Sequence, residues 1–429
     1  MRDKERLGHL DLEPLEIHIR SSMHHVGSMI LEKLLNSDSG DYRDRTLPCE
    51  RGHGYQFKDY RDKKLLTVLG PVRVRRAYYY DQQCRKGCCP KDSALDIVGT
   101  SFSPGLRRIM GRVGAWRPFG LGHEDMKEVA GICVDTKEIE RVSHQLGEEV
   151  EVFYKKETTL SLSGKIIPLN PVAKLYICID GTGVPVVKAE TVDRKGKGED
   201  CPAKTREAKL GCVFTQSTFD RDGYPIRDEA STSYIGAIET AEMFGDRMYA
   251  EAMFRGLDRA QKACVIGDGA PWIWNIADEQ FYGATQIIDL YHAREHYWTV
   301  ARVMFGCDKG EIRAWTAERR KELDQGKVEH VVEAIKHLTP STDQEKDAFE
   351  REIGYFEKNR DRMRYRDFRR QGLFIGSGVV EAGCRTVIGQ RLKQSGMHWT
   401  VRGANNIISL RCCILSNRWE DFWEYRSCA

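Results

Sequence analysis

Three acidic residues follow apolar or glycine-rich runs, in positions from which a carboxylate can hold a metal ion. Asp180 follows Tyr176–Ile179 and precedes Gly-Thr-Gly, Asp268 follows Cys264–Gly267 and precedes Gly-Ala, and Glu381 ends the run Gly-Ser-Gly-Val-Val-Glu. Acids at the ends of neighbouring buried strands project above a sheet, where their oxygens can bridge a hard cation. Each Asp alone also fits a structural turn, because Asp-Gly is a common turn signal. The triplet together indicates a two-metal phosphoryl-transfer site, the chemistry of nucleases and strand transfer.

A second pair, Asp289 and His292, follows the short apolar run Thr285–Ile288. The pair falls at a strand-to-helix junction, where the acid can orient the imidazole. A histidine held there can donate to a phosphate or to a metal-bound water. The alternative is a histidine that only caps the helix beginning at this point.

Alternating strands and helices must position these residues. Apolar runs predict strands over 172–179 and 209–218, a turn at Asp222-Gly223, a helix over 234–254, and short buried strands over 263–267 and 285–288. Acids at the strand ends of such an alternation describe a mixed α/β layer fold. Residues 291–370 contain one proline, Pro340, and long helical periodicity, so they are predicted to form a helical block before the turn 372–378. The third acid is then expected on a helix that packs against the sheet.

The N-terminal region is predicted to form a helix followed by a small β-ribbon. Helical spacing covers 8–36, a loop covers 37–41, and alternating runs at 65–69 and 72–80 predict two antiparallel strands around Gly70 and Pro71. Cysteines flank this ribbon on both sides, at Cys49 and at Cys84, Cys88 and Cys89.

The next region has the outline of a helix-turn-helix. The pattern turns helical from Ser103, Gly131 breaks that helix, and Asp135 with Glu138 offers a capping box for a second helix. Five residues of the second helix are predicted to face outward (Thr136, Lys137, Glu140, Arg141 and His144), while Ile139, Val142 and Leu146 pack inward. A helical hairpin without DNA contacts would have the same pattern. Residues 148–168 are predicted to link the domains.

Composition excludes several classes of protein. The chain has 429 residues, 41% hydrophobic and 31% charged, with a formal net charge of +3, which is typical of a globular protein of two or three domains. Neither a signal peptide over Met1–Arg20 nor a membrane span is expected, and the 14 scattered cysteines favour reduced thiols in a cytosol. Residues 61–108 hold 11 basic and 4 acidic side chains, and residues 358–402 hold 11 and 3. Two such basic regions favour a polyanion partner, although solvated charged faces would look alike.

Several runs of the sequence resemble the ISKra-type insertion-sequence transposases, a family of DDE transposases with a ribonuclease-H-like catalytic core. The runs that carry the resemblance, which extends over nearly the whole chain, are Thr67–Tyr79, Ser103–Arg108, Asp180–Pro185, Asp268–Trp274, Asp289–His292, Gly376–Glu381, and Gln394–Thr400 through Trp419. By this resemblance Asp180, Asp268 and Glu381 are the catalytic triad, and Asp289-x-x-His292 is similar to a (Cys/Asp)-x-x-His signature. The implied cofactor is a pair of Mg²⁺ ions, for which Mn²⁺ can substitute.

The basic residues of these regions are expected to hold double-stranded DNA, from the element ends and from the target. The expected DNA-binding residues are Arg73, Arg75, Arg76, Lys137, Arg141, Arg385, Arg391, Lys393 and Trp399. A buried core position is the alternative for Trp399.

The chain departs from the family at the ribbon. The family typically carries two Cys-x-x-Cys pairs suited to zinc, whereas this sequence offers Cys49, His53, Asp81 and Cys84. That mixture is unusual for structural Zn²⁺, which favours four Cys or His ligands. Two interpretations therefore stay open: a zinc site from these four residues, or a metal-free ribbon held by its apolar side chains.

The sequence therefore predicts an α/β catalytic core with a ribonuclease-H-like mixed sheet and an all-α insertion, preceded by a β-ribbon and a helix-turn-helix region. The predicted divisions are 1–100 for the helix and ribbon, 101–150 for the helix-turn-helix, 170–290 and 371–429 for the core, and 291–370 for the insertion. The expected function is Mg²⁺-dependent cleavage of transposon ends and strand transfer by a cytoplasmic, nucleoid-associated homo-oligomer. The alternatives are a catalytically inactive DNA-binding protein with the same fold and, less favoured, a stand-alone nuclease.

Overall fold

A computed structural model describes residues 12–428 of the chain, apart from positions 39, 50, 164–171, 193 and 197–201. The chain divides into two compact units. One holds the residues up to Leu146 and the last residues from Ser427 on, and the other holds Gly147–Arg426. No helix within the described ranges combines the length and the apolar character needed to cross a membrane.

The first unit begins with one long helix on an antiparallel sheet. Helix α2 spans Leu12–Leu35, and the sheet has the order β1-β2-β3-β4. Its strands are β1 (Thr46–Pro48), β2 (Gly54–Thr67), β3 (Gly70–Asp81) and β4 (Lys86–Cys88). The predicted helix and ribbon are confirmed from Leu12 on, and the first long strand starts eleven residues earlier than predicted, at Gly54 rather than at Leu65. Residues 8–11 of the predicted helix lie outside the described residues.

Apolar and basic residues alternate along β3, so one face of the ribbon is buried and the other is exposed. Val72 and Val74 are buried, whereas Arg73 and Arg75 between and after them are exposed, as the period of two along a strand requires. Leu65 and Ile97 complete the small core, against which Leu31, Leu35 and Leu95 pack.

Four helices follow the ribbon: α3 (Pro90–Ala94), α4 (Pro104–Trp116), α5 (Phe119–Ala130) and α6 (Thr136–Leu162). Gly131 ends α5 in the left-handed conformation, with φ of 68°, as the helix-breaking glycine predicts. The inward face of α6 is confirmed, since Ile139, Val142 and Leu146 are buried.

The outward face of α6 differs from the prediction at one position. Thr136, Lys137, Glu140 and Arg141 are exposed, but His144 is half-buried and its ring packs edge-on against Phe119 at 5.9 Å. The predicted linker is also corrected, because α6 runs on to Leu162 as one helix. The positions 164–168 of that prediction lie outside the described residues.

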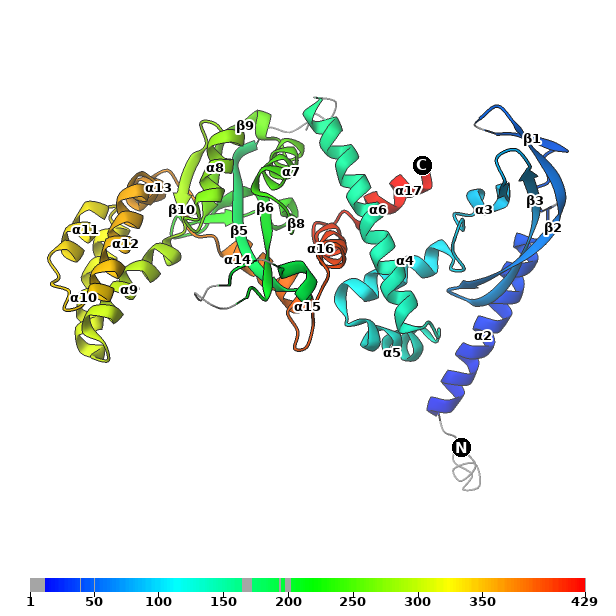
Figure 1. Cartoon of the computed structure of the whole chain (residues 1–429), viewed down its shortest axis with the longest axis horizontal. Helices are drawn as coiled ribbons and strands as arrows, with labels where there is room; N and C mark the ends of the chain where they lie inside the picture. Colours follow the sequence, from blue (N-terminus) through cyan, green and yellow to red (C-terminus); the bar gives the residue numbers. More distant parts are fainter. Residues whose placement is uncertain are drawn as a thin grey trace, which may run out of the picture. The chain divides into compact units, whose positions relative to one another are not determined.

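The second unit is built on a mixed sheet of six strands (Figure 1). The strand order is β10-β9-β5-β6-β7, and β8 also pairs with β6. The strands are β5 (Val172–Pro185), β6 (Thr205–Phe219), β7 (Pro225–Arg227), β8 (Ser233–Ala237), β9 (Ala260–Gly267) and β10 (Thr285–Ile288). The pairs β5–β9 and β9–β10 are parallel, and the pairs of β6 with β5, β7 and β8 are antiparallel.

Helices cover both faces of this sheet. A side chain at Gly211 would meet Met248 of α7 (Ala241–Phe254), whereas one at Gly236 would meet Ile408 of α16 (Val401–Leu415). Gly236 pairs with Leu210, the neighbour of Gly211, and successive residues of a strand face opposite sides. Helices α7 and α16 therefore lie on opposite faces of β6 and β8.

The remaining helices are α8 (Pro271–Gln280), which lies between β9 and β10 in the chain, and the helices of the insertion and of the C-terminal part. The insertion helices α9–α13 group beside the β10 edge of the sheet (Figure 1), which confirms a helical block over 291–370. The remaining helices are α8 (Pro271–Gln280), α9 (Leu290–Phe305), α10 (Lys309–Asp324), α11 (Val328–Lys336), α12 (Asp343–Asn359), α13 (Tyr365–Arg370), α14 (Gly378–Gly383), α15 (Gln390–Leu392) and α17 (Trp419–Cys428), with a π-helical stretch at Cys384–Gly389 and 3-10 turns at Lys188–Thr191, Glu229–Ser231, Leu257–Arg259 and Arg360–Met363.

One predicted element is partly wrong. The helix predicted over 234–254 begins only at Ala241, because Ser233–Ala237 form strand β8. The apolar run Tyr234–Ile238 is too short to show whether its period is two or 3.6, and pairing with β6 decides it.

Candidate functional site

Two of the predicted acids lie on or beside adjacent parallel strands: Asp180 is within β5, and Asp268 directly follows β9. Cys178 of β5 pairs with Ile266 of β9, so the same register carried two residues further puts Asp180 beside Asp268. Asp180 Oδ1 accepts the Gly181 N–H at 2.7 Å, and Asp268 Oδ1 accepts the Ala270 N–H at 2.9 Å. These short-range bonds fix each carboxylate at the point where β9 ends.

The pKa of Asp180 is raised by its surroundings. Burial raises the pKa of Asp180, and the negative charge of Asp268 raises it further. Hydrogen bonds from the Cys384 thiol and the Gly181 N–H, and the charge of His292, lower the pKa but do not cancel the effect of burial. A cation between the two acids would therefore be favoured on electrostatic grounds.

Helix α14, which carries Glu381, packs on the same face of the sheet. Asp180 pairs with Leu210, so both side chains lie on one face, and a side chain at Gly383 of α14 would meet Leu210. Glu381 lies two residues before Gly383 on α14. Cys384 directly follows Gly383, and its thiol hydrogen-bonds to Asp180. The predicted helix carrying the third acid is thus found against β5 and β6.

His292 lies close to both Glu381 and Asp289. One ligand atom each from Asp289, His292 and Glu381 lie within 4.8 Å of one another. His292 Nε2 is 3.9 Å from Glu381 Oε1, which also accepts the Ser377 hydroxyl at 2.7 Å. Asp180 and Asp268 are outside this group of three, and His292 acts on Asp180 through its charge.

The position of Asp289 corrects the role predicted for it. This residue is fully buried and is the N-cap of α9. Its Oδ1 accepts the backbone N–H of His292 at 2.8 Å, and its Oδ2 accepts the backbone N–H of Ser377. The carboxylate therefore holds the start of α9 and the turn before Glu381, and it contacts the backbone of His292, not its ring. Asp289 itself, and not His292, caps the helix.

A residue of the helical insertion, Tyr355, also contacts the backbone of Asp268. The sequence pattern did not indicate this contact. The Tyr355 hydroxyl of α12 donates to the backbone carbonyl of Asp268 at 3.0 Å. Its ring stacks on His296 at 3.5 Å, and His296 Nδ1 is 2.5 Å from Glu352 Oε2. Burial raises the pKa of Tyr355 well above its usual value, as do the charges of Asp268 and Asp289, so the hydroxyl stays a donor at neutral pH.

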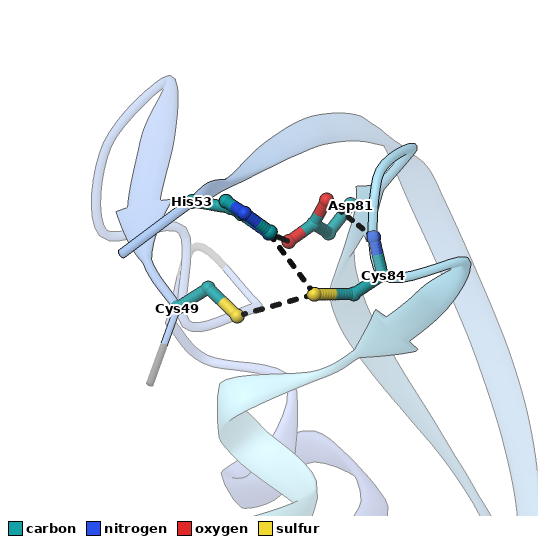
Figure 2. A group of neighbouring side chains, drawn as sticks. All are labelled: Cys49, His53, Asp81 and Cys84. Carbon is teal, nitrogen blue, oxygen red and sulfur yellow. Dashed lines mark hydrogen bonds and ion pairs between the residues drawn. The ribbon is translucent and has the colours of Figure 1, made fainter. Parts of the chain in front are cut away.

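A second group lies in the ribbon and contains the four residues predicted for zinc. Figure 2 shows Cys49, His53, Asp81 and Cys84 directed toward one another. One ligand atom from each lies within 4.8 Å of the others. The group is separate in sequence and in fold from the acids of the mixed sheet.

The predicted DNA-binding residues fall into two sets. Six are exposed: Arg73, Arg75, Lys137, Arg141, Arg385 and Lys393. Arg141 also pairs with Glu138 at 2.6 Å. Arg76 is partly buried and its guanidinium pairs with Asp92 at 2.6 Å.

Arg391 and Trp399 lie in the core. Arg391 is fully buried beside the Trp399 ring, 5.0 Å from its centroid, and the Trp399 indole N–H donates to the Leu392 carbonyl at 3.1 Å. Phosphate contacts need an accessible cation, so these positions do not support the predicted DNA contacts. The alternative of a core tryptophan describes what is observed.

Comparison with known proteins gives one result for the N-terminal part. A family described as an uncharacterised protein family, UPF0236, matches residues 7–109. The match covers α2, the ribbon and the beginning of α4, about a quarter of the chain. No curated protein matches the chain.

Proposed function

We propose that the chain is a DNA transposase of the ISKra type, which cleaves the ends of its element and joins them to target DNA by phosphoryl transfer. Two observations support this most: the strand register places Asp180 beside Asp268, and helix α14, which carries Glu381, packs on the same face of the mixed sheet. The mixed sheet and its helical insertion are compatible with a ribonuclease-H-like core.

The donor set fits Mg²⁺. Three carboxylates supply the hard oxygen ligands that this ion prefers, and the pKa of Asp180 is raised first by burial and then by the charge of Asp268. When bound, a pair of Mg²⁺ or Mn²⁺ ions would activate the attacking oxygen and stabilise the leaving one. Asp180, Asp268 and Glu381 are the residues that would hold them.

The chain's own groups then bind and orient the DNA. His292 is partly exposed between Glu295 and Glu381, at 3.4 and 3.9 Å, so its ring can donate to a phosphate oxygen. Ser377 fixes Glu381 through its hydroxyl. Lys393 bonds to the hydroxyl of Thr182, two residues after Asp180, and can neutralise a phosphate beside the acids.

Recognition of the element ends is assigned to the first unit. The helices α5 and α6 with the turn at Gly131 keep the helix-turn-helix outline, and Lys137 and Arg141 lie on its exposed face. Arg73 and Arg75 add exposed cations on the ribbon. These residues would contact phosphates and produce a steep salt dependence of binding.

A homo-oligomer is also proposed, because α2 presents an apolar stripe to solvent. Seven residues at spacings of three and four are 41–66% exposed: Leu12, Leu15, Ile19, Met23, Val26, Ile30 and Leu34. At 100° per residue they cover a strip about 100° wide, which is the width of a buried helix face. Covering them with the same strip of a second copy would contribute roughly 5–10 kcal/mol before the cost of association.

A cleavage assay tests the function. The full chain is incubated with Mg²⁺ and DNA that carries the flanks of its own gene, and the cuts are mapped on both strands. Cuts at defined positions on either side of the gene, absent with Ca²⁺ or EDTA, are expected. Specific binding without any cut would instead favour the catalytically inactive DNA-binding protein.

A further inference from the structure

The four side chains of the ribbon group come from two tight turns. Cys49 and His53 flank the turn between β1 and β2, where the Cys49 N–H donates to the His53 carbonyl at 2.8 Å and Gly52 has φ of 80°. Asp81 and Cys84 flank the turn between β3 and β4. Asp81 Oδ1 shapes that turn by accepting the N–H groups of Gln83 at 2.8 Å and Cys84 at 3.1 Å.

The distances within the group lie within about 0.4 Å of the edges of a tetrahedral zinc site. With Zn–S bonds of ~2.3 Å and Zn–N and Zn–O bonds of ~2.1 Å, the edges of a tetrahedron are about 3.8 Å for S to S, 3.6 Å for S to N and 3.4 Å for N to O. Here Cys49 Sγ is 3.8 Å from Cys84 Sγ, His53 Nδ1 is 3.2 Å from Cys84 Sγ, and His53 Nδ1 is 3.8 Å from Asp81 Oδ2.

One buried oxygen of the group is suited to bind a cation. The Asp81 side chain is 2% exposed, and its Oδ2 is buried with no hydrogen-bond partner among the described residues. A buried carboxylate oxygen without a donor is costly, and a metal ligand bond would satisfy it. The oxygen faces His53 and the two thiols, as Figure 2 shows.

We propose that Cys49, His53, Asp81 and Cys84 bind one Zn²⁺, with Asp81 Oδ2 as the fourth ligand. Two thiolates and an imidazole select zinc over the hard cations proposed for the acids of the sheet. Four protein ligands close the coordination sphere, which is typical of a structural site. The ion ties the β1–β2 turn to the β3–β4 turn and so holds both outer strands of the ribbon to its two long strands.

The metal content of the purified full chain tests this directly, and its readout does not depend on DNA cleavage. About one zinc per chain is expected after dialysis under reducing conditions. Cys84→Ser should lose the bound zinc, and Asp81→Asn should weaken zinc binding by about tenfold or more. The matched control is Cys307→Ser, an exposed cysteine of the second unit, which should keep one zinc.

Cobalt substitution separates zinc binding from loss of folding. The Co²⁺-loaded chain should show the absorption of tetrahedral cobalt with two thiolate ligands, and Asp81→Asn should change that spectrum while the helical circular dichroism is retained. A folded wild-type chain without bound zinc and without the cobalt spectrum would overturn the proposal. Unchanged zinc affinity and an unchanged cobalt spectrum in Asp81→Asn would overturn the assignment of the fourth ligand.

Discussion

Asp289 uses both carboxylate oxygens on backbone N–H groups, and this separates it from the other acids of the cluster. Asp180 and Asp268 each make one backbone bond through Oδ1 to a neighbour one or two residues away. Asp289 instead ties the start of α9 to Ser377, which in turn holds Glu381. Its role is therefore to position His292 and Glu381.

Substitution of Asp289 should separate positioning from metal binding. Asp289→Ala should lower the stability by about 1–2 kcal/mol, because it removes the cap of α9 and leaves the Ser377 N–H without its acceptor. Asp289→Asn keeps one acceptor oxygen, so its Mg²⁺-dependent cleavage should stay within about tenfold of the wild type. Thermal unfolding and cleavage rates measured in parallel check both. An Asn variant with unchanged stability and no cleavage would make Asp289 a metal ligand.

At the scale of elements, the helical insertion supports one of the acids. Helix α12 brings Tyr355 to the Asp268 carbonyl, and the turn after Asp268 is tight because Gly269 has φ of 105°. A side chain at Gly269 would come within 2.6 Å of the Tyr355 ring. Helix α12 of the insertion therefore packs directly against the turn that holds Asp268.

Tyr355→Phe should loosen that turn without removing the ring that stacks on His296. The lost hydrogen bond costs about 1 kcal/mol of stability. The Mg²⁺ concentration for half-maximal cleavage should rise several-fold, with a smaller fall in the maximal rate. Tyr282→Phe is the control, since Tyr282 is 97% exposed. An unchanged Mg²⁺ dependence would leave Tyr355 with a purely structural role.

Local patterns predicted the elements better than the contacts between them. The strand Thr285–Ile288 and the break at Gly131 follow from local apolar periodicity and a glycine, and both are observed. Tyr355 could not be predicted, because its contact with Asp268 spans 87 residues and depends on how the insertion folds back. The DNA contacts predicted for Arg391 and Trp399 are wrong for a different reason: basic and aromatic residues suit both a nucleic-acid surface and a buried cation–π pair.

At the scale of the whole molecule, the length of α6 limits where the chain can be truncated. Glu151 on its later part pairs with Arg247 at 2.7 Å, and Glu157 pairs with Arg418, both within the second unit. A division at residue 150 would cut this helix, so a truncated chain that keeps the catalytic unit should begin at Asp135. This truncation removes the ribbon and the first helices, including α2.

Such a truncation tests action in trans. We expect that a chain starting at Asp135, which lacks the apolar stripe of α2, does not restore strand transfer when it is mixed with the full-length Asp268→Asn variant. A full-length chain with alanine at Arg73, Arg75, Lys137 and Arg141 keeps α2 and should restore strand transfer in the same mixture, while neither protein of that pair is active alone. One protein would supply DNA recognition and the other the acids. Light scattering of the wild type on DNA gives the size of the assembly. Full activity from a species that remains monomeric on DNA would contradict the proposed homo-oligomer.

The most direct test of the proposed function is the rate of Mg²⁺-dependent end cleavage by Asp180→Asn, Asp268→Asn and Glu381→Gln. Each change removes a negative oxygen but keeps the shape of the side chain, so DNA binding should be retained while cleavage falls by about a thousandfold or more. Glu279→Gln, an exposed acid on α8, should cleave like the wild type. Near wild-type cleavage by any of the three variants would contradict the assignment of the acids.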